Sequence, residues 1–207
     1  FLDAGTYLMG AVQFLFPDGN PELMEYCSSF AEEGLRVLVI AHSDTVNENT
    51  EIPEGLEPVG LLLLTDVIRA EAPDTLAYFE GQGVDLKVIS GDDPVTVSAI
   101  AKRAGLKNAG QYIDATTITT QEEMDEAVAT YSVFGRVTPQ QKQAMVKSLQ
   151  AQKHTVAMTG DGVNDVLALK EADCSIAMAG GSDAAKNIAN VVLLDSNFAA
   201  MPEIVNQ

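Results

Sequence analysis

The residues best suited to chemistry lie in one short acidic string, Thr159-Gly160-Asp161-Gly162-Val163-Asn164-Asp165, directly after an apolar segment. Its two carboxylates stand four residues apart on a turn that glycines loosen, where a strand would end. Mg²⁺ takes one or two such hard oxygen ligands together with waters and a substrate phosphate. The string therefore predicts a magnesium site. An ordinary Gly-Asp turn that caps a helix would explain a single Asp-Gly pair, but it explains all seven residues poorly.

A second candidate is the string Ser90-Gly91-Asp92-Asp93-Pro94. Asp93 followed by Pro94 is a good pair for the N-cap and the first position of a helix. Ser90 would then present its hydroxyl and nearby loop N–H groups beside a helix N-terminus, where an anion binds. The alternative is helix capping with no ligand.

A third candidate is Lys142, in the segment that runs from residue 134 to 142. Thr138 and Gln141 have the spacing of a capping box, and Pro139 suits the first helical position. Lys142 would lie one turn into that helix, able to place its charge on a phosphate oxygen. A solvated surface lysine is the alternative, which is weakened because the acidic string follows one helix and one strand later.

The elements that must position these residues alternate along the chain. The hydrophobic pattern predicts strands at residues 59–64, 85–90, 132–135, 155–159, 174–178 and 191–194. It predicts helices at residues 72–82, 94–104, 122–130, 139–152, 166–172 and 183–190. Strands separated by such helices favour an α/β fold, a parallel sheet with helices on both faces. Ligands of such sheets lie at the carboxyl ends of the strands.

The first part of the chain has a different pattern. It predicts a strand at residues 7–16, a helix at 22–33 and a strand at 35–41, followed by an acidic linker or hinge at 43–58 with two prolines. Residues 1–68 carry 12 acidic side chains and one basic side chain, Arg36, whereas the remainder carries 18 acidic and 11 basic. The asymmetry indicates two units that join near residue 58.

Composition narrows the functional classes. The chain has 207 residues, of which 46% are apolar, so it can bury a core and disorder is disfavoured. A net charge of −18 disfavours sequence-independent nucleic-acid binding, and the apolar runs are too short to span a bilayer. Cys27 and Cys174 are isolated, which implies neither disulfides nor zinc and favours a reduced, cytosolic setting. The start at Phe1 without a signal peptide suggests a fragment of a longer protein.

The order of hydroxyl, lysine and acidic loop resembles the haloacid dehalogenase superfamily. Within it, the chain closely resembles the phosphorylation domain of P-type cation-transporting ATPases, of the group related to calcium ATPases. The likeness runs from the acidic string through Lys170-Glu171-Ala172-Asp173 and Gly181-Ser182-Asp183 to Asn197-Phe198. Upstream, Asp66-Val67-Ile68-Arg69 resembles the family's D-P-P-R element without its prolines, and Ser90 stands where the family usually has Thr.

The first unit resembles the second half of the same family's nucleotide-binding domain. Residues 5–11 resemble its K-G-A loop, with Met9 in place of the lysine, and Arg36 lies in a segment like the strand whose arginine reaches the nucleotide phosphates. The resemblance implies a partial α+β nucleotide-binding domain and linker at residues 1–57. It also implies a phosphorylation domain at 58–207, with a haloacid-dehalogenase-like Rossmannoid sheet that lacks its nucleophile strand.

The resemblance also implies roles for the residues. Asp161 would bind Mg²⁺, Lys142 would contact the transferring phosphoryl group, Ser90 and Asn164 would hydrogen-bond its oxygens, and Asp165 would hold Lys142 or the loop. ATP would be bound or lined by a larger set, namely Arg36, Asp66, Arg69, Gly91, Asp92 and Arg136. The full protein would couple ATP hydrolysis, through an aspartyl phosphate, to cation transport. This region would lie on the cytosolic face of a membrane, with actuator and transmembrane domains elsewhere in the polypeptide.

The family's nucleophilic string D-K-T-G-T does not occur in the chain, and Asp3-Ala4-Gly5-Thr6 is a poor substitute. We therefore expect the chain alone to be inactive. Two alternatives remain open: a soluble phosphatase of the same superfamily, which would need an upstream D-x-D, and a regulatory domain with a degenerate site.

Overall fold

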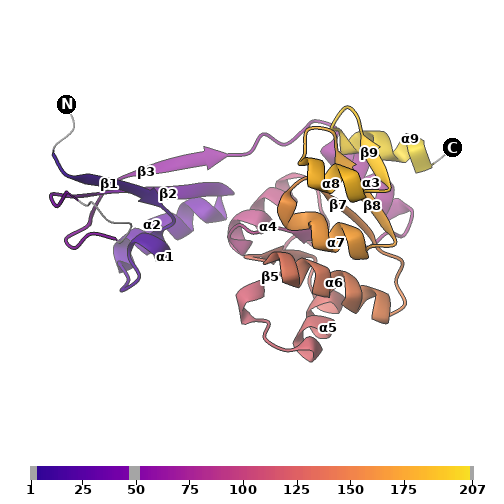
Figure 1. Cartoon of the computed structure of the whole chain (residues 1–207), viewed down its shortest axis with the longest axis horizontal. Helices are drawn as coiled ribbons and strands as arrows, with labels where there is room; N and C mark the ends of the chain where they lie inside the picture. The colour runs from indigo at the N-terminus through magenta and orange to yellow at the C-terminus, as the bar shows by residue number, and fades with distance from the viewer. Residues whose placement is uncertain (1–3, 47–51, 206–207) are drawn as a thin grey trace. The chain divides into compact units, whose positions relative to one another are not determined.

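The computed structural model describes residues 4–46 and 52–205. The chain forms two compact units, here called unit 1 and unit 2, which divide between Val67 and Ile68 (Figure 1). Part of the predicted linker, residues 47–51, and Asp3 lie outside the described residues.

Unit 1 is a three-stranded antiparallel sheet with two helices. Its elements are β1 (Thr6–Gly10), α1 (Val12–Leu15), α2 (Pro21–Glu32), β2 (Leu35–Ser43) and β3 (Glu57–Thr65), with strand order β1-β2-β3. The helices cover one face of the sheet (Figure 1), because the alternate residues Val37, Val39 and Ala41 pack in one apolar cluster with side chains of α1 and α2. Helix α2 begins where the Asn20 side chain accepts a hydrogen bond from Leu23 N.

Two predictions for this part of the chain are wrong. The strand expected at residues 7–16 ends at Gly10, and α1 follows it. The strand expected at 59–64 is not part of a parallel sheet: it is the core of β3, which pairs antiparallel with β2. The boundary of the compact units therefore lies ten residues later than 57/58. The physical reason is that an apolar run does not reveal strand direction or partner, and β3 is an exposed edge strand.

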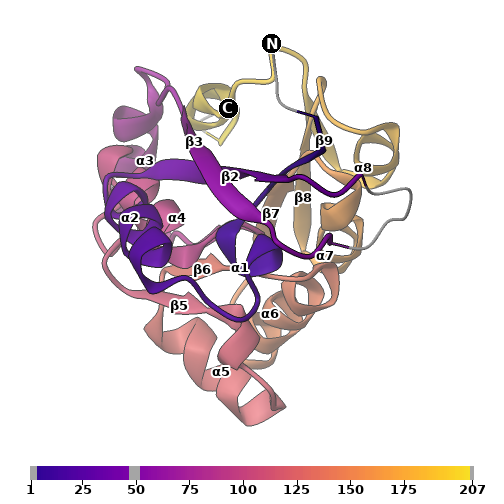
Figure 2. The ribbon, with the colours of Figure 1, turned by 90° about the vertical axis from the view of Figure 1, so that its left-hand side faces the viewer.

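Unit 2 contains two parallel three-stranded sheets. The strands β4 (Val88–Ile89), β6 (Val133–Gly135) and β5 (Tyr112–Asp114) form one in that order, and β7 (Ala157–Gly160), β8 (Cys174–Met178) and β9 (Val191–Leu193) form the other (Figure 2). The main helices are α3 (Ala72–Gly81), α4 (Pro94–Arg103), α5 (Gln121–Thr130), α6 (Pro139–Ala151), α7 (Val166–Glu171), α8 (Asp183–Ile188) and α9 (Met201–Val205). Strand β5 and helix α9 were not predicted.

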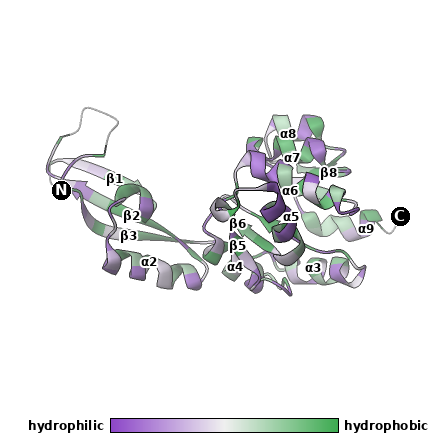
Figure 3. Ribbon diagram, turned by 90° about the horizontal axis from the view of Figure 1, so that it is seen from below, coloured by the Kyte–Doolittle hydropathy of each residue, from purple (hydrophilic) through white to green (hydrophobic). Residues whose placement is uncertain are grey.

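Helices cover both faces of these sheets, which confirms the predicted α/β class. In β6, Val133 packs with residues of α3 and α4, whereas the next residue, Phe134, packs with residues of α5 and α6. Successive strand residues point to opposite faces, so each face of the sheet has its own helix layer. The helices of unit 2 carry both hydrophilic and hydrophobic residues in the hydropathy view, as helices that cover a sheet do (Figure 3).

Two helices are shared between the sheets. Neighbouring residues of α6, Met145 and Val146, belong to the clusters under the first and the second sheet respectively. On the other face, Leu76 and Phe79 of α3 divide in the same way. One helix on each face therefore packs against both sheets. β4 is a terminal strand of the first sheet, and β7 is a terminal strand of the second.

Within residues 4–46 and 52–205, no helix is both long enough and apolar enough to cross a membrane.

Candidate active site

The acidic string forms a loop at the carboxyl end of β7 that is organised around Asp165. One carboxylate oxygen of Asp165 accepts hydrogen bonds from Gly162 N at 3.0 Å and from Asp161 N at 3.3 Å. Its other oxygen accepts from Lys142 Nζ at 2.7 Å. The side chains of Lys142 and Asp165 are only 12% and 11% exposed. Asp165 therefore holds the loop and the lysine at once.

Glycine is needed at the end of β7 because of close packing. A Cβ on Gly160 would lie 2.6 Å from Asp165 Cβ, nearer than two nonbonded carbon atoms can approach. Only a residue without a side chain lets the Asp165 carboxylate fold back over the loop.

Asp161 is exposed, in contrast to Asp165, and no described basic side chain forms an ion pair with its carboxylate. Nor does any group of three or more His, Cys, Asp or Glu side chains gather into a metal site within the described ranges. A single outward carboxylate fits a Mg²⁺ ion that takes its other ligands from water and a substrate phosphate. It does not fit a metal held by protein side chains alone.

Lys142 reaches the loop from the first turn of α6. The capping box that starts the helix is present: Gln141 N donates to the Thr138 hydroxyl at 3.3 Å, and Thr138 N donates to the Gln141 side chain at 3.1 Å. Lys147, further along the helix, is 55% exposed, whereas Lys142 is nine-tenths buried. Lys142 is therefore not a solvated surface lysine.

Ser90 lies at the carboxyl end of β4, just as the acidic loop lies at the carboxyl end of β7. Its backbone N–H donates to Phe134 O at 2.9 Å, and its hydroxyl accepts from Asp92 N at 3.1 Å. The Asp93 carboxylate accepts from Val95 N at 3.0 Å, so it is the N-cap of α4, as its sequence position predicts. Gly91, between Ser90 and Asp92, is exposed.

Arg136 fastens this loop to the ends of β5 and β6. Its guanidinium donates to Asp93 and to Asp114, both at 2.7 Å, and its backbone N–H donates to Asp92 O at 2.8 Å. Its backbone is left-handed, with φ of 52°. Burial alone would raise the pKa of Asp114, but hydrogen bonds from Thr116 and the charge of Arg136 together hold that pKa below its usual value. Sequence reasoning missed Asp114, because it is the last residue of β5, a strand of only three residues that no sequence pattern signals.

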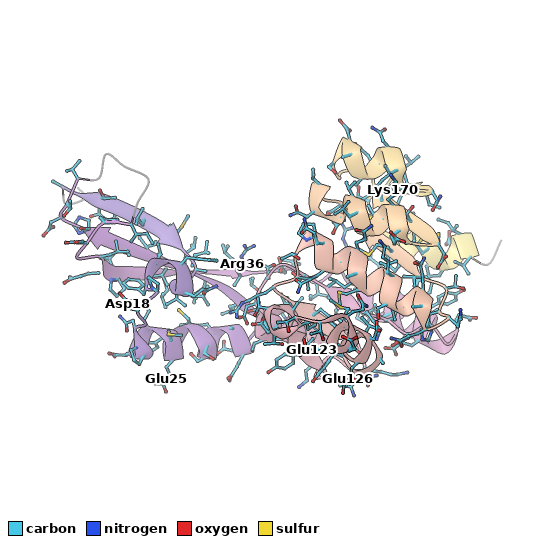
Figure 4. All side chains as sticks on the ribbon, turned by 60° about the horizontal axis from the view of Figure 1, so that its bottom comes forward. Asp18, Glu25, Arg36, Glu123, Glu126 and Lys170 are labelled. Atoms are coloured by element: carbon cyan, nitrogen blue, oxygen red, sulfur yellow. The ribbon has the colours of Figure 1, made fainter. Side chains whose placement is uncertain are left out.

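Of the remaining predicted residues, Asn164 lies in the acidic loop, and Arg36, Asp66 and Arg69 lie outside both loops. Arg36 is in β2 of unit 1 (labelled in Figure 4), and Asp66 follows β3 in the same unit. Arg69 is the second residue of unit 2, and its carbonyl oxygen accepts a hydrogen bond from Ala72 N at the start of α3. Asn164 is exposed in the short turn Val163–Asp165. The structure thus brings Lys142 of α6 to the loop that holds Asp161 and Asp165. It also brings Arg136, which follows β6, to the loop that holds Ser90 and Asp92.

Known proteins with similar sequences share this region. A probable cation-transporting ATPase, exp7, of Streptococcus pneumoniae is 46% identical over 97% of the chain, and a calcium-transporting ATPase, CtpE, of Mycobacterium bovis is 42% identical over all of it. The chain covers 25% and 26% of those two proteins, so it spans about a quarter of their length.

A solved structure shows the same fold. The chain aligns over its whole length with 27% of a zinc-transporting PIB-type ATPase in its E2·Pi state, at 21% identity and a TM-score of 0.62. The family model of haloacid dehalogenase-like hydrolases matches residues 9–173, which is most of the chain and includes both Lys142 and the Asp161 loop. Fold, loop geometry and sequence agree, and the chain belongs to the haloacid dehalogenase-like hydrolase family.

Proposed function

We propose that the chain is the phosphorylation region, with part of the nucleotide-binding domain, of a P-type ATPase that moves a cation across a membrane. The observation that carries the proposal is the buried Lys142–Asp165 pair beside an outward Asp161 at the carboxyl end of β7. Phosphoryl transfer needs positioning and charge neutralisation more than covalent chemistry from the protein. This arrangement supplies a fixed cation and a metal ligand side by side.

The two sheets of unit 2 support the assignment to a phosphorylation domain that lacks its nucleophile strand. β4 and β7 are each a terminal strand of their own sheet, and α3 and α6 pack against both sheets. A loop with candidate phosphate or metal ligands follows each of these two strands. One further parallel strand between β4 and β7 would join the sheets. Its carboxyl end would lie between the Ser90 loop and the Asp161 loop, where an aspartate would meet both.

Unit 1 would supply the nucleotide side. Residues that face each other across an antiparallel pair share a face, and Met9 lies opposite Ile40, four residues from Arg36 on β2. Met9 and Arg36 are therefore on the sheet face away from α2, where Tyr7, Leu62 and Leu64 are also exposed. The exposed apolar side chains of this face suit an adenine ring, and Arg36 suits the phosphates. Met9 would pack against the nucleotide at the position where the family's lysine would add a positive charge.

In this proposal Asp161 would hold Mg²⁺, which neutralises the phosphoryl oxygens when it is bound. Lys142 and Ser90 would contact those oxygens, Asn164 would donate from the loop, and Asp165 would keep Lys142 in place. Gly91, Asp92, Arg136, Asp66 and Arg69 would line the nucleotide path. The transported cation would be bound by membrane helices of the same polypeptide, beside an actuator domain. Calcium is the first cation to test, because the mycobacterial relative's name includes it.

A chimera tests the proposal. The matching 203 residues of the pneumococcal relative would be replaced by this chain, and membranes would be given ATP labelled on its γ-phosphate. We expect an acid-stable phosphoenzyme that Lys142→Ala abolishes and that Lys147→Ala, on the same helix, preserves. A chimera that folds and incorporates no phosphate, or one indifferent to Lys142→Ala, contradicts the proposal. If the chain alone instead released phosphate from small phosphate esters, the soluble phosphatase would be favoured.

The chain by itself should form no phosphoenzyme and turn over no ATP, because the string D-K-T-G-T does not occur in it. Label on Asp3, which lies outside the described residues, would contradict this.

A further inference from the structure

The segment Ala179–Ser182, between β8 and α8, packs against the backbone of Asp161. Ser182 N donates to Asp161 O at 2.7 Å. A Cβ on Gly181 would lie 2.7 Å from Asp161 O, 2.9 Å from Asp161 Cβ and 3.0 Å from Asp161 Cα. The two segments therefore touch backbone to backbone, at a separation that no side chain on Gly181 would permit.

This segment is itself held in place on several sides. Gly181 N donates to Met178 O at 2.9 Å, and Ala179 N donates to Leu193 O at 3.0 Å, which fixes its start to β8 and the end of β9. Lys186 Nζ donates to Ala179 O at 3.2 Å. The Ser182 hydroxyl accepts from Ala185 N at 3.2 Å and so begins α8. The support behind Asp161 is therefore anchored and cannot easily yield.

Hydrogen bonds thus hold the main chain of Asp161 at both its N–H and its carbonyl group. Asp161 N donates to the Asp165 carboxylate, and Asp161 O accepts from Ser182 N. The side chain has no ion-pair partner among the described residues to orient it, so its direction depends on where these two contacts place its Cα and Cβ. Gly181 is not at positive φ, and its need for glycine comes from the close approach alone.

We propose that Gly181 and Ser182 are positioning residues for the metal-binding carboxylate: they set the direction in which Asp161 presents its oxygens to Mg²⁺. The inference rests on the proposed function of Asp161. Groups that orient a ligand in this way change metal affinity by on the order of 10–100-fold when they are altered.

The test is titration of the ¹⁵N-labelled chain with Mg²⁺ alone, followed by the amide signals of Gly160 and Gly162. Gly181→Ala should weaken Mg²⁺ binding by about tenfold or more. The matched control is Gly180→Ala in the same segment, where an added Cβ meets only the Ser196 hydroxyl at 3.3 Å. That variant should bind as the unaltered chain does.

A second pair of variants covers the case in which Gly181→Ala does not fold. Ser182→Pro removes the N–H that donates to Asp161, at a residue whose φ of −65° already suits proline. Ser182→Ala keeps that N–H and removes only the helix-capping hydroxyl. We expect the proline variant to lose affinity and the alanine variant to keep it, with signals of the β4-β6-β5 sheet unchanged in both.

The outcomes separate two failures. If the unaltered chain shows Mg²⁺ shifts that Asp161→Asn removes, and Gly181→Ala and Ser182→Pro bind equally well, the positioning inference is wrong and the metal site stands. If the unaltered chain shows no shift that depends on Asp161, the metal assignment fails, and the inference fails with it.

Discussion

Removal of one partner of the ion pair between Lys142 and Asp165 should strongly destabilise unit 2. The two charged atoms of the pair are 2.7 Å apart and both side chains are nearly buried, so removal of one partner leaves the other charge uncompensated. Removal of one partner of a buried ion pair lowers the free energy of unfolding by about 3–5 kcal/mol. Asp165 keeps two backbone N–H donors when the lysine is lost, so we expect the lower end, about 3 kcal/mol, for Lys142→Met. Methionine keeps the apolar stem and removes only the ammonium.

A double-mutant cycle isolates the pair from other effects. Asp165→Asn alone should also cost about 3 kcal/mol, because it leaves the Lys142 ammonium buried. The double variant buries no unpaired charge, so it should be less destabilised than the sum of the two by about 2 kcal/mol. Lys147→Met is the matched control on the same helix: its ion pair with Glu171 spans 3.5 Å and is half exposed, so the cost should stay below about 1 kcal/mol.

The assay is urea unfolding at pH 7, followed by amide signals of Phe134 and Val146 in unit 2 and Val39 in unit 1. NMR is preferred because the chain has no tryptophan to report on either unit. The unit 2 signals should shift to lower urea in Lys142→Met, with little change at Val39. The reasoning is refuted if Lys142→Met costs no more than Lys147→Met, or if the costs of the two single variants simply add.

Three further results are expected. Gly135→Ala should destabilise unit 2 by about 2–3 kcal/mol in the same assay, because its Cβ would lie 2.4 Å from backbone atoms of Pro94, whereas Gly110→Ala, with open space around it, should not. Backbone N–H groups at the start of α5 hold the pKa of Glu123 below its usual value, so its ionised form stabilises the fold above the unfolded pKa of about 4.3, and this is lost as pH falls through the folded value. Melting temperatures of Glu123→Gln should therefore change less between pH 5 and pH 3 than those of the unaltered chain. Burial raises the pKa of the Cys27 thiol, so it should react slowly with thiol reagents at pH 8 until urea unfolds unit 1.

Local signals in the sequence predicted local structure well. The capping box of Thr138 and Gln141 and the N-cap Asp93 are where their spacing places them, because each depends on contacts within four residues. Their helices start at the predicted residues. The charged helix surfaces, such as α5 with Glu123 and Glu126 (Figure 4), likewise follow from the pattern of polar positions.

Contacts between distant residues were beyond such signals. Arg136 joins Asp93 and Asp114, which are 43 and 22 residues away, and no spacing rule connects them. The prediction that β3 belongs to a parallel sheet was wrong for the same reason: an apolar run fits a buried parallel strand and an antiparallel edge strand equally well. The placement of β3 depends on antiparallel pairing with β2, where Leu61 lies opposite Val39 and packs in the core of unit 1, a contact between residues far apart in the sequence.

The two aspartates of the acidic string show how one turn assigns different tasks to like side chains. After β7 ends, the turn Val163–Asp165 rotates Asp165 inward, where it accepts two amide hydrogen bonds and the charge of Lys142. Asp161 precedes that turn and stays exposed. A pair of carboxylates that converged on one ion would repel each other and need full charge compensation by the metal. Here Lys142 compensates the charge of Asp165, whereas no described basic side chain forms an ion pair with Asp161, whose carboxylate is available to a cation. Lys142 has three N–H donors, of which the Asp165 contact at 2.7 Å takes one, so the ammonium can be held by the carboxylate and still donate to a phosphate oxygen.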